Sequence, residues 1–161
     1  MLRQLSEESK HLFFSQLLTD NKKNISTEKS LIVCGSGNNG GDGFAVARLL
    51  TEQGKHADVL FAGKEASLSE ECRCQKQIVE NMGISVFTEF PDEEYTVIID
   101  AVFGVGLCRE ITGHYKDVID WMNLQDAEKV AVDIPSGICA ATGKILGTAF
   151  RADLTVCMAC V

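Results

Sequence analysis

Short runs of apolar residues alternate along the chain with longer stretches of helical periodicity. We expect six strands, at Ser30 to Cys34, Ala57 to Ala62, Ile84 to Phe87, Thr96 to Ile99, Lys129 to Val132 and Leu154 to Met158. Apolar residues recur at helical spacing in the segments between them, which predicts helices over Gly43 to Gln53, Leu68 to Met82 and Tyr115 to Met122. This alternation is typical of an α/β fold with a mainly parallel sheet.

The beginning of the chain has a different pattern. Residues 1–29 predict a leading helix and a connector, because an amphipathic stretch from Ser6 to Thr19 is followed by polar residues from Asp20 to Glu28. Residues 30–161 predict a single α/β domain, and no internal repeat is visible.

Composition narrows the function classes. The chain has 161 residues, 45% hydrophobic and 24% charged, which is typical of one globular domain. Its net charge of −8, with no basic cluster, argues against binding to nucleic acid or to an anionic membrane surface. Its apolar runs are far shorter than the roughly 20 residues that span a bilayer, and no signal peptide follows Met1, so we expect a cytoplasmic protein.

Cysteines and histidines are scattered rather than arranged in a site. The seven cysteines are odd in number and irregular in spacing, which argues against a disulfide framework. Cys157 and Cys160 form a C-x-x-C with no helix after it, and Cys72 with Cys74 makes only an isolated pair, so we expect buried or incidental thiols. We expect surface or helix positions for His11, His56 and His114.

Three polar clusters each follow a predicted strand: Gly35 to Gly43, Asp100, and Asp133 to Gly137. Parallel strands end on one side of a sheet, and open α/β sheets bind ligands outside those ends. We therefore expect the three clusters to share one crevice.

The segment from Gly35 to Gly43 predicts a loop that binds phosphate or pyrophosphate. Its glycines allow positive φ and close approach of the backbone to a ligand, and the next helix would point N–H groups at an anion. It also matches the dinucleotide fingerprint from Gly35 to Gly40, but Lys55 and His56 lie where a ribose-binding acid is expected. The alternative is a ligand-free turn, although such turns usually have about two to six residues.

Asp100 and Asp133 would place two carboxylates in that crevice. Like charges at close range raise one pKa or call for a cation between them. Asn39 and Ser136 could add neutral oxygens, and such a set suits a weakly held hard cation better than zinc. The alternatives are that Asp100 caps a turn and that the segment from Asp133 to Gly137 only reverses the chain.

The motifs themselves resemble those of a known family. Gly37-Asn-Asn-Gly-Gly-Asp-Gly43, Asp100-Ala-Val-Phe-Gly-Val-Gly-Leu107 and Val132-Asp-Ile-Pro-Ser-Gly137 resemble, in that order, signature stretches of NAD(P)H-hydrate epimerase domains. The resemblance runs from about Leu31 to Val156. It implies a Rossmann-like three-layer sandwich, binding of hydrated NADH or NADPH, and one potassium ion as cofactor.

Carried over motif by motif, the resemblance also implies the site residues. The substrate site would be lined by Asn38, Asn39, Gly40, Gly41, Asp42, Gly104, Val105, Gly106, Leu107, Cys108, Arg109, Glu110 and Asp133. The potassium ligands would be Asn39, Asp100 and Ser136.

The activity implied is epimerisation of the R and S forms of the hydrated nucleotide, a repair reaction without a redox step. A hydroxyl beside the ring nitrogen can leave once it is protonated, so acid–base help and orientation suffice. We assign the proton transfer to Asp133, with Asp42 as the next candidate. A non-catalytic nucleotide-binding or scaffold module of the same fold is the alternative, and a dehydrogenase rests on the glycine fingerprint alone.

The resemblance also suggests two kinds of partner. One is a second copy of the chain, in a homodimer, and the other is an ADP-dependent dehydratase that is fused to the chain or cooperates with it. The family's Met-Glu-Asn-Ala-Gly-like segment is not found before the first strand, and the chain ends at Val161, where the family continues with further strands. We therefore expect a C-terminally truncated domain, in which catalysis and dimerisation are affected more than ligand binding.

Overall fold

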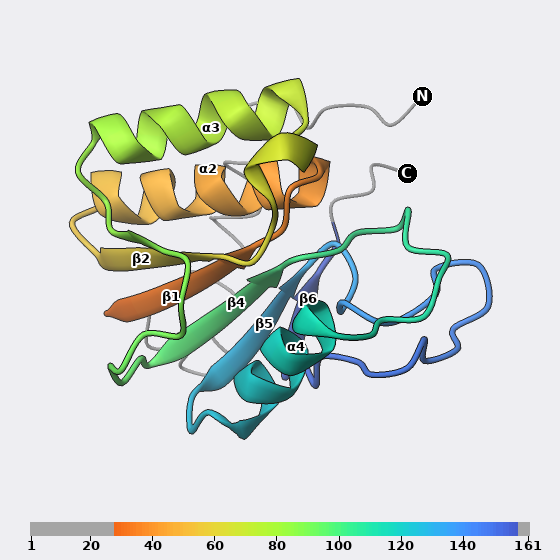
Figure 1. The fold of residues 1–161 in the computed structure, drawn as a ribbon. Coiled ribbons are helices and arrows are strands. Elements are labelled where there is room, and N and C mark those ends of the chain that lie inside the picture. The colour runs from red at the N-terminus through yellow and green to blue at the C-terminus, as the bar shows by residue number, and fades with distance from the viewer. Residues whose placement is uncertain (1–27, 158–161) are drawn as a thin grey trace.

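The computed structural model describes residues 28–157, which form a parallel sheet with helices on both faces (Figure 1). The strands are β1 (Lys29–Cys34), β2 (His56–Phe61), β3 (Val86–Phe87), β4 (Val97–Ala101), β5 (Glu128–Val132) and β6 (Leu154–Val156). The helices are α2 (Asn38–Glu52), α3 (Glu70–Asn81), α4 (His114–Leu124) and the short 3₁₀ helix η1 (Glu65–Ser67). The helix expected at Ser6 to Thr19 lies outside the described residues.

The sheet has the order β3-β2-β1-β4-β5-β6, and every pair of neighbouring strands is parallel. Ile32 of β1 is in register with Val59 of β2 on one side and with Ile99 of β4 on the other. The chain builds outward from β1 in one direction and then, from β4, in the other. The strand order therefore reverses between β1 and β4, which is where open α/β sheets bind their ligands.

Both faces of the sheet are covered, which explains why its central strands are almost uninterrupted apolar runs. On one face α2 and α3 lie over a core that includes Ile32, Phe44 and Leu50. On the other face α4 covers a second core that includes Leu31 and Ile119. The α/β, three-layer prediction is confirmed.

The start of α2 differs from the prediction. This helix begins at Asn38 rather than Gly43, so only three residues, Gly35 to Gly37, separate it from β1. The expected nine-residue loop is therefore wrong, and so is the argument from its length. Glycine has low helix propensity, which is why the segment reads as a loop in the sequence.

The glycines of this segment serve close packing rather than positive φ, which none of them adopts. A Cβ atom at Gly40 would lie 2.0 Å from the carbonyl oxygen of Gly35. One at Gly43 would lie 2.5 Å from Ala101 Cβ, on β4. The glycines therefore let the first turns of α2 lie directly against the ends of β1 and β4.

Most other boundaries agree with the prediction to within two residues. The strand expected at Ile84 to Phe87 shortens to Val86–Phe87, because the Ile84 N–H donates to Val79 O at the end of α3. Strand β4 extends to Ala101, so Asp100 lies inside a strand rather than after it. Within residues 28–157 no helix is long and apolar enough to cross a membrane.

Candidate active site

The three polar clusters meet at the carboxyl edge of the sheet, on the neighbouring strands β1, β4 and β5. The Gly35 N–H after β1 donates to Ala101 O at the end of β4, at 3.1 Å. Ser136, after β5, hydrogen-bonds to Asp100 of β4. The three clusters therefore lie together at this edge, and the crevice that they would share stays a prediction.

Asp100 is fully buried and accepts three hydrogen bonds. Its Oδ1 accepts from Ser136 Oγ at 2.6 Å and from the Val102 N–H at 3.1 Å, and its Oδ2 accepts from the Ser136 N–H at 2.7 Å. Burial raises the pKa of Asp100 from 3.8 to about 6, and the hydrogen bonds from Ser136 and Val102 oppose that shift. The cause is thus desolvation, and not a second carboxylate at close range as expected from the sequence.

Ser136 links two of the polar segments. Its hydroxyl donates to Asp100 and also accepts a hydrogen bond from the Phe103 N–H at 2.9 Å. Ser136 is only 1% exposed, so these partners replace water for its polar atoms. The hydroxyl therefore holds the turn after β5 against both β4 and the start of the segment that follows β4.

Asn39 approaches the same place from the first turn of α2. A Cβ atom at Gly104 would lie 3.4 Å from Asn39 Cγ, so the amide group lies beside the segment after β4. The Nδ2 atom of Asn39 is buried and has no hydrogen-bond partner in the protein. An unsatisfied buried amide costs about 1–3 kcal/mol, so a ligand or water is expected here.

Asn39 therefore lies beside Gly104, and Ser136 contacts both the Phe103 N–H and the Asp100 carboxylate, so an amide, a hydroxyl and a carboxylate adjoin the start of the segment after β4. No group of three or more His, Cys, Asp or Glu side chains suited to a metal occurs among the described residues, so this donor set does not suit zinc. One carboxylate with neutral oxygens fits a weakly held hard cation.

Asp133 follows β5 directly and has an unusual backbone conformation. Its φ is +70°, and among the described residues it is the one non-glycine with positive φ. Its N–H donates to Val156 O, and the Ile134 N–H donates back to Val132 O, which closes a three-residue γ-turn. Such a conformation costs about 1–3 kcal/mol, and residues that adopt it cluster at active sites and ligand-binding sites.

The predicted turn at Asp133 to Gly137 is also present. The Ile138 N–H donates to Pro135 O, and Gly137 has a φ of +98°. A Cβ atom at Gly137 would lie 1.9 Å from Thr148 O. This position therefore requires glycine for two reasons, its positive φ and the lack of space for a side chain. The segment therefore reverses the chain and also presents Asp133, so the two alternative interpretations do not exclude each other.

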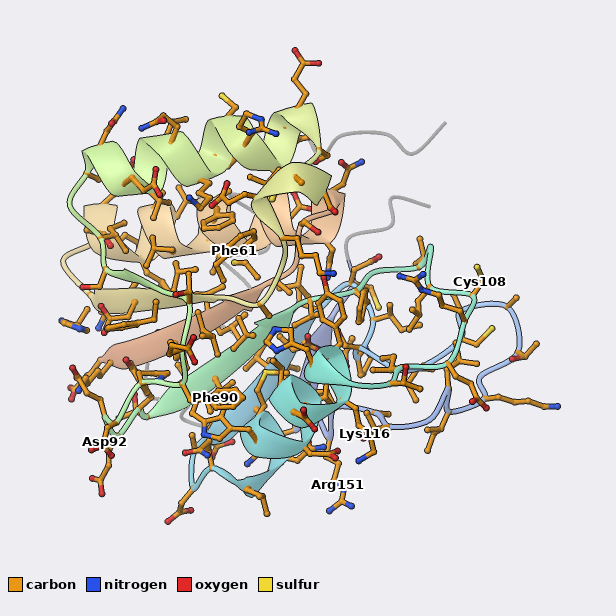
Figure 2. All side chains as sticks on the ribbon, viewed as in Figure 1. Phe61, Phe90, Asp92, Cys108, Lys116 and Arg151 are labelled. Carbon is orange, nitrogen blue, oxygen red and sulfur yellow. The ribbon has the colours of Figure 1, made fainter. Side chains whose placement is uncertain are left out.

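Of the other expected substrate residues, those in the first turns of α2 lie at the same edge, whereas the segment of residues 104–110 starts beside Asn39 and extends away from the sheet (Figure 2). Gly40 and Gly41 are buried in α2, whereas Asn38 is exposed and Asp42 is half-buried. Residues 104–110 form an irregular segment after β4 that is exposed or half-buried, and Val105 is 45% exposed. Figure 2 shows Cys108 in this segment, far from the sheet and from Phe61 at the end of β2.

Sequence reasoning missed one residue at this edge. His114 was expected on the surface or in a helix, and it is indeed the first residue of α4. Its Nε2 also donates to Ala62 O, at 3.1 Å, just beyond the end of β2. The glycine stop at Gly113 could have indicated that His114 begins α4, but no local pattern pairs it with Ala62.

Two cysteines near the site, Cys34 and Cys72, are structural. Cys34 and Cys72 are buried and free, and the Cys72 thiol donates to Gly35 O at 3.6 Å. Burial raises the pKa of both thiols, that of Cys72 to about 12, so neither is a reactive thiolate at neutral pH. For these two, the expectation of buried thiols is confirmed, whereas Cys160 lies outside the described residues.

Comparison with known proteins gives concordant matches. The profile of the family described as "YjeF-related protein N-terminus" matches residues 4–161. The NAD(P)H-hydrate epimerase of Oenococcus oeni is 42% identical over 137 residues, covering 84% of this chain and 65% of that protein. The enzyme of the same name from Weissella koreensis is 42% identical over 130 residues, covering 80% and 59%.

A solved structure has a similar fold. The crystal structure of yeast ynu0 matches with a TM-score of 0.73 and 20% identity, covering 91% of this chain and 65% of that one. The chain spans 59% to 65% of the length of the two curated relatives.

Proposed function

The chain belongs to the family of YjeF-related N-terminal domains, and we propose that it interconverts the R and S forms of hydrated NADH and NADPH. Curated relatives at 42% identity carry the name of that activity. The observation that carries the proposal is the position of Asp133. It lies in a strained turn that Ser136 ties to buried Asp100, at the edge where the strand order reverses.

Asp133 supplies the proton in this proposal. In the hydrate, a hydroxyl is bonded to a ring carbon next to the ring nitrogen. The Asp133 carboxyl gives its proton to that hydroxyl, the C–O bond breaks, its electron pair leaves with water, and the nitrogen lone pair forms a C=N bond. Water then adds to the opposite face of the ring and returns a proton to the carboxylate.

The residues around Asp133 position the turn and balance charge. Potassium would be held by Asn39, Asp100 and Ser136. Its positive charge would stabilise the charged form of the Asp100 carboxylate, which burial disfavours. Support for this comes from the donor set, because Asp100 and Ser136 supply a carboxylate and a hydroxyl and Asn39 can add its amide oxygen. The unpartnered Nδ2 of Asn39 is a hydrogen-bond donor, so it suits an acceptor atom of the substrate or a water and not the ion. Ser136 fixes the turn that carries Asp133 whether or not the ion is bound.

The dinucleotide would lie along the edge at the reversal of strand order. The first N–H groups of α2, at Asn38 and Asn39, suit the pyrophosphate, because unpaired N–H groups and the helix dipole favour an anion. Residues 104–110 would line the other side, where their exposed side chains are accessible to the ligand.

The direct test is to mix the purified chain with one epimer of the hydrate and follow the other by chromatography. We expect a rate well above that of buffer, and D133N is the matched control. A folded chain that binds the hydrate by calorimetry without accelerating the reaction would instead favour the non-catalytic binding module.

A cytoplasmic location, a homodimer and cooperation with an ADP-dependent dehydratase belong to the same proposal. Light scattering of the purified chain tests dimerisation. Co-purification with a dehydratase from cytoplasmic extract tests the other two.

A further inference from the structure

The chain just beyond β2 lies against the turn between β1 and α2. The Ala62 N–H donates to Cys34 O at 2.9 Å, and a Cβ atom at Gly63 would lie 2.8 Å from the Ser36 nitrogen. Lys64 follows at once. The end of β2 therefore adjoins the turn that would hold the pyrophosphate.

In a dinucleotide site of this strand order, the residue at the end of the second strand contacts the adenosine ribose. An acid there binds the 2′-hydroxyl, whereas a basic residue accommodates a 2′-phosphate. The nearest acid, Glu65, is paired with Lys76 at 2.8 Å. Asp58 is near the opposite end of β2, where it pairs with His56 at 2.9 Å.

Strand β2 ends at Phe61, so the ribose-binding position follows Phe61 and is not at Lys55 and His56, where the spacing in the sequence placed it. Lys64 is the cation that follows this strand end. It is exposed, and no ion pair engages its ammonium group among the described residues. A second nitrogen-bearing side chain reaches the same place from the other face of the sheet, because His114 Nε2 donates to Ala62 O. Because Nε2 donates to a carbonyl, Nδ1 can donate to a phosphate oxygen only in the imidazolium form, in which both ring nitrogens are donors.

We propose that Lys64 and His114 form a subsite for the 2′-phosphate of the adenosine half, so that the chain prefers hydrated NADPH to hydrated NADH. This inference rests on the proposed function, because it takes a nicotinamide dinucleotide as the ligand. The hydrogen bond to Ala62 holds the imidazole beside Gly63, and the lysine adds charge from the adjoining residue.

The test compares two probes that differ only in the 2′-phosphate, adenosine 2′,5′-bisphosphate and 5′-AMP, by calorimetry. We expect the bisphosphate to bind the wild-type chain about tenfold more tightly, which is the scale of one charge-assisted hydrogen bond. K64A should lose most of this preference, and H114A should lose part of it. K55A is the matched control, because Lys55 precedes β2 at the opposite edge of the sheet and should leave the preference intact.

Equal affinity for both probes, no binding of either, or an unchanged preference in K64A would overturn the subsite. Failure of the proposed function is distinguishable. If both hydrates are epimerised with equal kcat/KM, the epimerase stands and the subsite fails. If neither is epimerised but the bisphosphate preference depends on Lys64, the subsite stands and the epimerase fails.

Discussion

Ser136 donates to both carboxylate oxygens of Asp100, although 36 positions separate the two residues. Its backbone N–H donates to Oδ2 and its hydroxyl donates to Oδ1. Ser136, which follows β5, therefore supplies two of the three hydrogen bonds that the buried carboxylate on β4 accepts. The geometry of the candidate site depends on this pair, because the turn that carries Asp133 is attached to the sheet through it.

S136A should therefore be costly. It removes the hydroxyl from Asp100 Oδ1 and from the Phe103 N–H, and a lost hydrogen bond to a charged group costs about 1.5–3 kcal/mol. Urea unfolding measures the free energy change. S69A is the comparison, since it removes the side-chain cap of α3 and should cost about 1 kcal/mol. Equal costs for the two variants would count against a special role for Ser136.

The stability contribution of Asp100 should fall as pH rises. The folded chain holds this proton more tightly than the unfolded chain, because the pKa is raised from 3.8 to about 6. The contribution is therefore complete below pH 4 and is lost as pH rises through about 6. A shift of this size corresponds to about 3 kcal/mol. Without potassium, the unfolding free energy of wild type minus that of D100N should decline by about this amount from pH 3 to pH 7. A pH-independent difference would contradict this prediction.

Potassium should raise the melting temperature of the folded chain. At an ion concentration ten times its dissociation constant, the gain is about 1.4 kcal/mol, or a few degrees. Replacing potassium by a bulky organic cation should reverse the gain, as calorimetry would show. D100N should respond much less, because it lacks the charge that holds the ion. Identical melting curves for wild type in both salts would contradict the proposed potassium site.

D133N should lower turnover by about 100- to 10,000-fold while changing the affinity for the hydrate much less, because it keeps the shape but removes the transferable proton. Asparagine tolerates positive φ at least as well as aspartate, so this variant should fold normally. Turnover at the wild-type rate would show that another group supplies the proton, and Asp42 is the next candidate.

D133G separates backbone strain from chemistry. Glycine adopts a φ of +70° without steric cost, so D133G should be more stable than wild type, by about 1 kcal/mol, and yet inactive. Thermal unfolding and the epimer assay measure the two effects. A destabilised D133G would show that the side chain itself supports the turn.

Two glycines three positions apart should respond in opposite directions. In G40A the new methyl group would lie 2.0 Å from Gly35 O, so α2 must shift, at a cost of about 2 kcal/mol or more. In G37S the new side chain meets nothing within 4 Å, and serine can cap α2, where no side-chain cap is present. The unfolding free energy should fall for G40A and stay level or rise for G37S.

The apolar pattern alone predicted the parallel sheet and its covering helices. Strands such as Leu31 to Cys34 are buried on both faces, so they are apolar at successive positions. This local pattern can be recognised without knowing which distant residues pack against the strand. The placement of the three polar clusters at one edge also follows from the sequence, because parallel strands all end on the same side of the sheet. The candidate site could thus be located, and its motifs identified, before any coordinates.

Only the tertiary structure decided the details that give those residues their chemistry. The helix start at Asn38 depends on space between β1 and β4 that only glycine leaves, which overrides local propensity. The pKa of Asp100 is raised by burial beneath elements far away in the chain, and the pairing of His114 with Ala62 joins residues 52 positions apart. Such contacts leave no periodic trace in the sequence, because each is set by the packing of whole elements against one another.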